Sequence, residues 1–174
     1  GSTFKWIRPI RSILAIFGGQ PLPYNLYLGD HAKGENPALL PTSAAQGKNF
    51  CVPLGNTTQG HRFMGTGVIT VQGYQDYVAS LRQAKVVLDR EERKAMILAG
   101  AQALLAPQGL KVKADPGLVE EVCGLVEWPV PLLGNIDARF MTVPPEVLTT
   151  TMRSNQKYLA VVNDQGQMQP HFIV

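Results

Sequence analysis

The stretch from Leu125 to Gly134 constrains this chain more than any other, because it places one carboxylate and one indole inside an apolar run. Glu127 and Trp128 are followed by prolines on both sides of Val130, and these prolines restrict the backbone. Apolar runs of this kind belong in a core, where an unpaired charge is expensive to bury. The run therefore predicts a buried Glu127 that pairs with one of the arginines of the chain.

Length and composition are those of an ordinary folded protein. The chain has 174 residues, of which 45% are hydrophobic and 17% are charged, so it can bury a core without disulfides or metals. Its apolar runs are too short to cross a bilayer, and no signal peptide is visible. Gly1 and Ser2 are typical of residues left by tag removal, so they are excluded from the fold. For the remaining residues, 3–174, we expect a single domain.

Cysteines and histidines give no sign of a metal site. Cys51 and Cys123 lie far apart in the sequence, and the three histidines are scattered. No pair has the spacing of metal ligands, and two distant cysteines do not make a disulfide framework. We therefore expect reduced thiols and a cytoplasmic protein.

Basic residues are concentrated in the first third of the chain. Residues 1–62 carry six Lys and Arg against two Asp and Glu, a net charge of +4, whereas the remainder carries −1. A basic segment is compatible with a phosphate-rich partner, and a solvated surface explains the excess equally well.

Apolar spacing, caps and turns predict an α+β fold with a mixed β-sheet and packed helices. Asp89 with Glu92 forms a capping box, and Asp115 followed by Pro116 starts a further helix. Pro23 favours an edge position for the first strand. Residues 29–57 form a long loop excursion with one short strand inside it.

The predicted elements alternate irregularly along the chain. The last strand still runs where the sequence ends, so we expect an excerpt of a longer protein. Helices are predicted at 4–17, 74–84, 89–105, 115–123 and 144–155, and strands at 22–28, 50–54, 68–71, 86–88, 110–113, 130–133, 158–162 and 167–174. The strands at 86–88 and 130–133 are expected to be buried.

Two segments combine side chains that can bind anions. On the predicted first helix, Arg8 and Arg11 share a face and could hold phosphates, or one of them could pair with Glu127. In the second segment, Gly60 allows a close backbone approach, and His61 and Arg62 could bind an anion. Alternatively, that segment is a turn in which His61 satisfies a backbone carbonyl and Arg62 closes a structural ion pair.

Two further segments leave their alternatives open. Glu127 could be a general base or part of a ligand-reading corner, although half of a structural ion pair is the simpler role. Arg153 and Lys157 lie near the C-terminus of a predicted helix, where cations interact favourably with the helix dipole. Equally, they could contact a nucleic-acid backbone. No phosphate-binding glycine loop, nucleophile arrangement or carboxylate pair occurs in the sequence, so the residues predict no catalytic site.

An ordered series of motifs resembles the beta subunit of the bacterial two-subunit glycyl-tRNA synthetase. The series covers nearly the whole chain, and its order and spacing are specific although each motif alone is weak. Its members are Trp6–Arg11, Gly60–Phe63, Asp89–Arg93, Glu121–Val130, Val143–Leu148, Gln156–Tyr158 and Pro170–Ile173. Two cations common beside the second motif are replaced here by Asn56 and Gln59, and the excursion near 29–55 is longer than expected for the family.

The resemblance implies a cytoplasmic, heterotetrameric ligase that joins glycine to its tRNA at the expense of ATP. ATP, with Mg, would bind at the alpha subunit, so no cofactor is expected in this segment. The beta subunit is associated with tRNA, and the alpha subunit and tRNA are the implied partners. The fold also resembles, distantly, the editing-type domain of phenylalanyl-tRNA synthetase beta chains.

Within that family, we expect this segment to be a structural and tRNA-orienting domain without chemistry of its own. A hydrolytic editing-type domain and a spacer that contacts the alpha subunit are the alternatives. A size sieve for glycine, the smallest amino acid, argues against a need for editing. We predict a polar cluster with Glu127 as its hub, formed by Arg8, Arg11, His61, Arg62, Glu127, Gln156 and Lys157.

Overall fold

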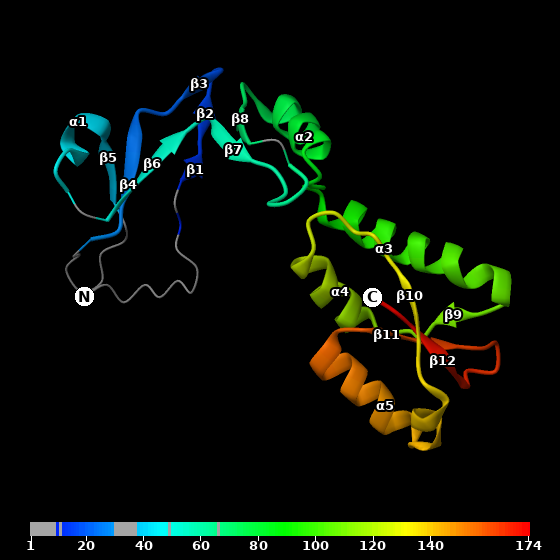
Figure 1. Cartoon of the computed structure of the whole chain (residues 1–174). Coiled ribbons are helices and arrows are strands. Elements are labelled where there is room, and N and C mark those ends of the chain that lie inside the picture. The colour runs from blue at the N-terminus through cyan, green and yellow to red at the C-terminus, as the bar shows by residue number, and fades with distance from the viewer. Residues whose placement is uncertain (1–9, 11, 30–37, 49, 66) are drawn as a thin grey trace. The chain divides into compact units, whose positions relative to one another are not determined.

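The chain divides into two compact units, Gly1–Ala84 and Lys85–Val174, which are described separately. The structure is a computed structural model that describes residues 10, 12–29, 38–48, 50–65 and 67–174 (Figure 1). Each unit combines helices with small β-sheets, which confirms the predicted α+β class. A single domain over residues 3–174 and the resemblance to an editing-type domain stay predictions.

The first unit is built on a mixed four-stranded sheet. Its strand order is β1-β6-β4-β5, with β1 parallel to β6 and the other neighbours antiparallel. Two short hairpins, β2–β3 and β7–β8, and two helices complete the unit. The elements are β1 (Ile13–Leu14), β2 (Ile16–Phe17), β3 (Gln20–Pro21), β4 (Tyr24–Tyr27), β5 (Ala38–Pro41), α1 (Thr42–Ala45), β6 (Cys51–Gly55), β7 (Thr57–Gln59), β8 (Val68–Thr70) and α2 (Tyr74–Gln83).

The predicted helix at 4–17 is wrong where the structure describes it. Residues 13–14 and 16–17 form strands, and most of the preceding segment lies outside the described residues. The reason is the pair Gly18-Gly19, which adopts φ of +59° and +77°. Two consecutive positive φ values make the tight turn of a hairpin, so the glycines join β2 to β3 instead of ending a helix.

The excursion at 29–57 holds more regular structure than expected. It contains β5, α1 and β6, and β6 confirms the short strand predicted near 50–54. Because β5 and β6 flank β4, the predicted edge position of β4 is wrong. Pro23 is tolerated because it lies before the first paired residue of β4, where its carbonyl accepts a bond of 3.1 Å from the amide of Thr42.

The second unit packs two helices onto an antiparallel sheet of order β10-β12-β11-β9. α3 and α4 cover this sheet, and the core between them includes Ala101, Cys123 and Val161, all fully buried (Figure 1). The elements are α3 (Arg90–Leu105), the 3₁₀ turn η1 (Ala106–Gln108), β9 (Lys111–Val112), α4 (Pro116–Leu125), β10 (Leu133–Asn135), the 3₁₀ turn η2 (Ala138–Thr142), α5 (Pro145–Thr151), the π-turn η3 (Met152–Gln156), β11 (Leu159–Val162) and β12 (Met168–Ile173).

Both predicted helix caps of the second unit are confirmed. The Asp89 carboxylate accepts a bond of 2.7 Å from the amide of Glu92, and the Asp115 carboxylate accepts one of 2.9 Å from the amide of Leu118. Each carboxylate satisfies a backbone N–H that has no partner inside the helix. These two bonds fix where α3 and α4 begin.

Two predicted buried strands of this unit are wrong. Residues 86–88 form no strand, because their carbonyls are bonded by a side chain: the Arg93 guanidinium donates to the oxygens of Val87 and Leu88 at 2.7 and 2.9 Å. The strand expected at 130–133 begins instead at Leu133, and Val130 is 61% exposed. Prolines at 129 and 131 have no N–H to donate to a neighbouring strand.

None of the helices formed by the described residues combines the length and hydropathy needed to cross a membrane.

Asp115 predicts an acid-dependent loss of stability. Its bond from the Leu118 amide, followed by its contact with Arg153, lowers the pKa of this carboxyl below its usual range. A lowered folded-state pKa stabilises the fold above the unfolded value of about 4 and loses that effect as the pH falls through the folded value. Denaturant titrations at several pH values should show a steeper loss below about pH 4 in the wild type than in Asp115→Asn.

Asn at position 115 is a matched control, because its side-chain oxygen can still cap α4 but carries no charge. Equal losses of stability on acidification in the two proteins would contradict this role of the charged Asp115.

Candidate nucleic-acid interface

The loop that follows β7, residues 60–65, is fixed to the end of α2 by its main chain. The amide of His61 donates to the carbonyl of Ala84 at 2.8 Å, and the amide of Gly65 donates to the carbonyl of His61 at 2.7 Å. A Cβ at Gly60 would lie 2.3 Å from the Cβ of Ala84, far inside van der Waals contact. This confirms the prediction that Gly60 permits a close backbone approach.

The imidazole of His61 stabilises the same loop from inside. Its Nδ1 accepts hydrogen bonds of 3.2 Å from the amides of both Phe63 and Met64. The ring therefore accepts hydrogen bonds from backbone amides. The alternative prediction, that His61 satisfies a backbone carbonyl, is wrong for this nitrogen. Since Nδ1 acts as an acceptor, the proton of the neutral ring is assigned to Nε2.

The loop presents a cation and an aromatic ring to solvent, which we call the Arg62–Phe63 tip. Phe63 is 83% exposed, and the Arg62 guanidinium carbon lies 5.6 Å from the centroid of its ring. Among the described residues, no carboxylate forms an ion pair with Arg62, so the predicted structural ion pair is absent there. Within the described part of the chain, the tip therefore offers a positive charge without a carboxylate partner, beside an exposed aromatic ring.

A similar pair in the second unit has its charge neutralised. The Arg139 guanidinium carbon also lies 5.6 Å from the centroid of a neighbouring ring, that of Phe140, which is 51% exposed. In contrast to Arg62, Arg139 forms an ion pair with Asp137, at 3.2 Å between Nε and Oδ1. The two pairs thus share a local geometry and differ in available charge.

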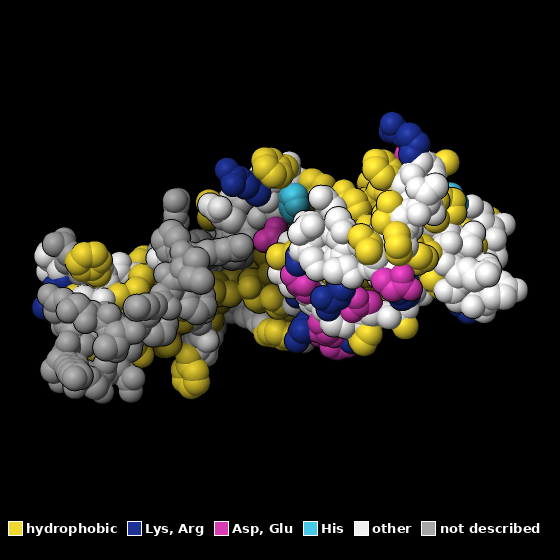
Figure 2. All heavy atoms as spheres, turned by 90° about the horizontal axis from the view of Figure 1, so that it is seen from below, with side chains coloured by type: hydrophobic (Ala, Val, Ile, Leu, Met, Phe, Trp, Pro, Cys, Tyr) yellow, Lys and Arg dark blue, Asp and Glu magenta, His cyan; other side chains and the backbone are white. Residues whose placement is uncertain are grey.

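The net charges of the two units differ in the same direction as the charges of the two arginine–phenylalanine pairs. The sequence of unit Gly1–Ala84 holds seven Lys and Arg against three Asp and Glu, a net +4, whereas Lys85–Val174 holds nine against ten, a net −1. Figure 2 shows acidic and basic side chains interleaved over one face of the second unit. An unbalanced positive charge therefore belongs to the unit that carries the Arg62–Phe63 tip.

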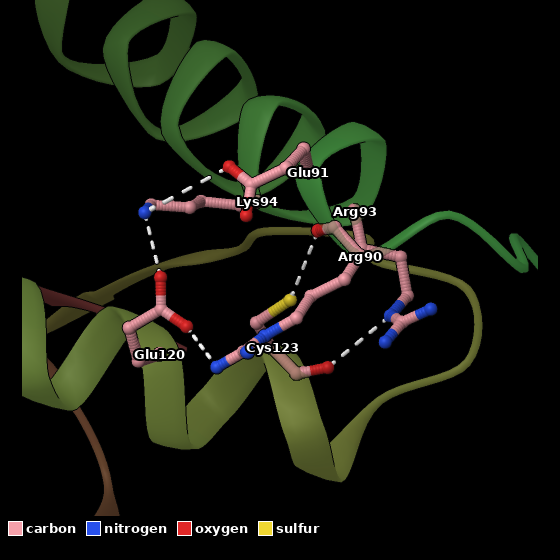
Figure 3. Close-up of polar contacts among 6 residues, drawn as sticks. All are labelled: Arg90, Glu91, Arg93, Lys94, Glu120 and Cys123. Atoms are coloured by element: carbon pink, nitrogen blue, oxygen red, sulfur yellow. Dashed lines mark hydrogen bonds and ion pairs between the residues drawn. The ribbon is translucent and has the colours of Figure 1, made fainter.

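The cations of α3 are used in a network with α4 (Figure 3). Lys94 Nζ lies 2.6 Å from one oxygen of Glu120, and Arg90 donates to the other. The hydrogen bond between Lys94 and Glu120 raises the pKa of Lys94 and lowers the pKa of Glu120. This network was not predicted from the sequence. The spacing of Glu91 and Lys94, three apart, indicates the contact between those two residues but not their neighbour Glu120.

Two partly buried hydrogen bonds to backbone carbonyls continue this network between α3 and α4. Cys123 donates its thiol to the carbonyl of Arg90 at 3.3 Å, and Arg93 Nε donates to the carbonyl of Cys123 at 3.2 Å (Figure 3). Together these contacts lock the start of α3 onto α4, which is a structural role and not a ligand site.

Arg153 and Lys157 also pair with α4. Arg153 Nε lies 2.7 Å from an oxygen of Asp115, and Lys157 Nζ lies 2.8 Å from an oxygen of Glu121. Lys157 adopts φ of +60° where η3 ends. Both cations are therefore paired with carboxylates of the second unit.

Gln156 and Lys157 lie together at an apolar groove of about 210 Å³. The groove runs along residues 125–126 and 129–131, which belong to the apolar run from Leu125 to Gly134, and it reaches β11 and β12. Its other lining side chains are apolar, so the groove offers packing area but no reactive group.

The prediction of a buried Glu127 is wrong. Glu127 is exposed, and no hydrogen bond or ion pair of its carboxylate occurs within the part of the chain that the structure describes. Its main-chain carbonyl instead accepts a bond of 2.9 Å from the amide of Val87. The neighbouring Trp128 ring lies under Lys85, with Nζ 4.7 Å from a ring centroid. Exposure to water removes the need for a cationic partner.

The predicted polar cluster stays a prediction as a whole. Arg8 and Arg11 lie outside the described residues, so their contacts with Glu127 are not described. His61 and Arg62 belong to the first unit, and Glu127, Gln156 and Lys157 belong to the second. Of the seven residues, the structure brings His61 next to Arg62 in one loop, and Gln156 next to Lys157 at one groove.

Within the described ranges, no group of three or more His, Cys, Asp or Glu side chains could hold a metal ion.

Comparison with known proteins identifies the family. The family model described as glycyl-tRNA synthetase beta subunit matches residues 1–174. Relatives named glycine–tRNA ligase beta subunit are 48% identical in Rhodospirillum centenum, over 98% of this chain, and 40% identical in Magnetococcus marinus, over 98%. A third, from Phenylobacterium zucineum, is 38% identical over 99%. The chain belongs to the glycyl-tRNA synthetase beta subunit family, which confirms the predicted resemblance.

These relatives are much longer than the chain. It spans 24%, 21% and 23% of the relatives from Rhodospirillum centenum, Magnetococcus marinus and Phenylobacterium zucineum.

The close approach at Gly60 predicts a large effect of a single methyl group. Gly60→Ala forces a clash with the backbone and Cβ of Ala84, which should lower the free energy of unfolding by about 1–3 kcal/mol. Urea denaturation measures this change. Gly55→Ala is the matched control, because a Cβ there meets nothing within 4 Å, and it should stay within about 0.5 kcal/mol of wild type. Equal effects of the two substitutions would contradict the contact.

Proposed function

We propose that this chain is part of a glycine–tRNA ligase, which attaches glycine to its tRNA at the expense of ATP, and that it orients tRNA without chemistry of its own. In this proposal its partners are the alpha subunit and tRNA, the whole enzyme is a cytoplasmic heterotetramer, and ATP with Mg binds at the alpha subunit. Membership of the beta subunit family and the names of its relatives support the assignment to the ligase.

The Arg62–Phe63 tip is the observation that carries the tRNA-orienting role. A guanidinium binds phosphate oxygens through paired N–H donors, and an exposed aromatic ring stacks on any base. The loop that bears the tip is fixed by the contacts of Gly60, His61 and Gly65, so the two side chains are presented without a large cost in backbone ordering. A rigid tip of this kind suits positioning more than catalysis.

Charge favours the first unit over the second as the RNA-facing part. Phosphate contacts supply most of the sequence-independent affinity for nucleic acid, and they require cations that are not already neutralised. Arg62 meets that requirement within the described residues, whereas Arg139, Arg153 and Lys157 each pair with a carboxylate. We therefore propose that tRNA contacts the Arg62–Phe63 tip.

The distribution of perturbed groups supports a role without chemistry. Catalytic acids and bases are commonly groups in a cleft whose pKa is shifted by burial or a charged neighbour. Here the clearly shifted groups of the described residues are members of ion pairs or helix caps, namely Lys94, Asp115, Glu120 and Asp137. The hydrolytic alternative would need a group that activates water, and none of these four is free to do so.

Removal of the tip should weaken tRNA binding in a salt-dependent way. For the double variant Arg62→Ala/Phe63→Ala, we expect an affinity for tRNA lower by about tenfold or more, since one stacked base is worth about 1–3 kcal/mol. The slope of log K against log salt should fall by about one unit, because one phosphate contact is lost. Fluorescence anisotropy with labelled tRNA at graded salt measures both quantities.

Arg139→Ala/Phe140→Ala is the matched control, because it removes the same two side-chain types in the same local geometry. It should leave affinity and slope close to those of the wild type. A wild-type chain with no affinity for tRNA would favour the spacer that contacts the alpha subunit. Deacylation of mischarged tRNA above background would favour the editing alternative.

A further inference from the structure

A second concave site lies in the first unit, at the opposite end of α2 from the Arg62–Phe63 tip. It is a cavity of about 330 Å³ where the β2–β3 hairpin faces the start of α2. The loop of the tip is bonded to Ala84, just after α2, whereas the cavity is lined by Gly73 and Tyr74, where α2 begins. A helix of this length, Tyr74–Gln83, spans about 15 Å.

Aromatic and backbone surfaces dominate the described walls of this cavity. Tyr74 lines it and is 70% exposed, Tyr77 lines it from the next turn of α2, and apolar side chains of β1 and β2 form part of the wall. On the opposite side, Gly18 and Gly19 present backbone without side chains, and a Cβ on either would meet nothing within 4 Å. The space between Tyr74 and the hairpin is therefore open to a flat ligand.

The wall nearest the helix is held rigid by Asp76. One oxygen of its carboxylate accepts a bond of 2.9 Å from the amide of Gln72, and the other accepts one of 3.2 Å from the hydroxyl of Ser80. The amide of Tyr77 donates to the carbonyl of Gly73 at 2.9 Å. These bonds occupy Asp76 and fix the backbone beside Tyr74, while the Gln72 side chain, which also lines the cavity, can both donate and accept hydrogen bonds.

The chemistry of the walls selects the class of ligand. None of the described lining residues is charged, so the walls hold no side chain that would neutralise a phosphate or another ionic group. A nucleobase fits because it combines a flat face for stacking on tyrosine with an uncharged edge that pairs with an amide or with backbone. The net charge of +4 on this unit favours a ligand whose remaining backbone is anionic.

We infer that the cavity between Tyr74 and the Gly18-Gly19 turn holds an unpaired nucleobase of RNA. This inference rests on the proposed function and deepens it, because it names single-stranded RNA as the element recognised by this unit. A base inside a duplex is stacked between its neighbours and cannot enter the cavity. The unit should therefore prefer single-stranded RNA over the same sequence in a duplex.

The test measures binding of the 174-residue chain to a short labelled single-stranded RNA and to the same RNA annealed to its complement. Tyr74→Ala should lower the affinity for the single strand by about tenfold or more, and Tyr74→Phe should keep it within about twofold, because the ring is retained. Tyr24→Ala, which removes an exposed tyrosine of β4 in the same unit, is the control and should leave the affinity unchanged.

Gly73→Leu gives an independent variant that keeps every tyrosine. Gly73 lines the cavity with φ of −177°, an extended backbone that any residue adopts, and a Cβ there meets nothing within 4 Å. A leucine side chain should therefore occupy the mouth of the cavity without disturbing the fold, and it should lower single-strand affinity as Tyr74→Ala does. This variant keeps the test decisive if Tyr74→Ala does not fold.

Three results would overturn the inference. They are equal affinity for single strand and duplex, unchanged binding by both Tyr74→Ala and Gly73→Leu, or an effect of these variants on binding of the alpha subunit but not of RNA. If they leave RNA binding intact while Arg62→Ala/Phe63→Ala weakens tRNA binding, the cavity inference fails and the proposed function stands. If the wild-type chain binds no tRNA, the proposed function fails first.

Discussion

The contact between Gly60 and Ala84 is the constraint on which the candidate interface depends. With no side chain at residue 60, the main chain of the loop comes close enough for the amide of His61 to bond the carbonyl that follows α2. The His61 ring accepts hydrogen bonds from the amides of Phe63 and Met64, and the side chains of Arg62 and Phe63 extend into solvent. Exposure of a cation and an aromatic ring is thus a consequence of backbone packing.

The second unit distributes its charges in the opposite way. Its helices α3 and α4 begin at carboxylate caps. Five of its cations pair with acidic side chains of the same unit, namely Arg90, Lys94, Lys111, Arg153 and Lys157. Exposed pairs of this kind contribute little individually to stability. Their larger effect is to place a carboxylate beside each of these cations. Arg139 has such a partner in Asp137, whereas Arg62 has none among the described residues, although both guanidiniums lie 5.6 Å from a phenylalanine ring.

Features set by neighbouring residues could be predicted from the sequence. The caps at Asp89 and Asp115 and the close approach at Gly60 each follow from one or two residues with a strong local preference. Features set by distant partners could not. Residues 13–14 and 16–17 are strands because they meet β6 and β3. Glu127 and Val130 are exposed although the run around them is apolar, and the prolines beside Val130 have no N–H to donate to a sheet. The pairing of Lys94 with Glu120 depends on how α3 packs against α4 and has no sign in the local sequence.

Site-specific cross-linking tests the central claim most directly. A photoreactive phenylalanine analogue replaces Phe63 in one protein and Phe140 in another, and each is irradiated with tRNA at moderate salt. We expect cross-linked tRNA from position 63 and little from position 140, because Arg139 beside Phe140 pairs with Asp137, whereas Arg62 beside Phe63 pairs with no carboxylate of the described residues. Equal cross-linking from both positions, or cross-linking from position 140 alone, would contradict the assignment of the Arg62–Phe63 tip as the RNA-facing surface.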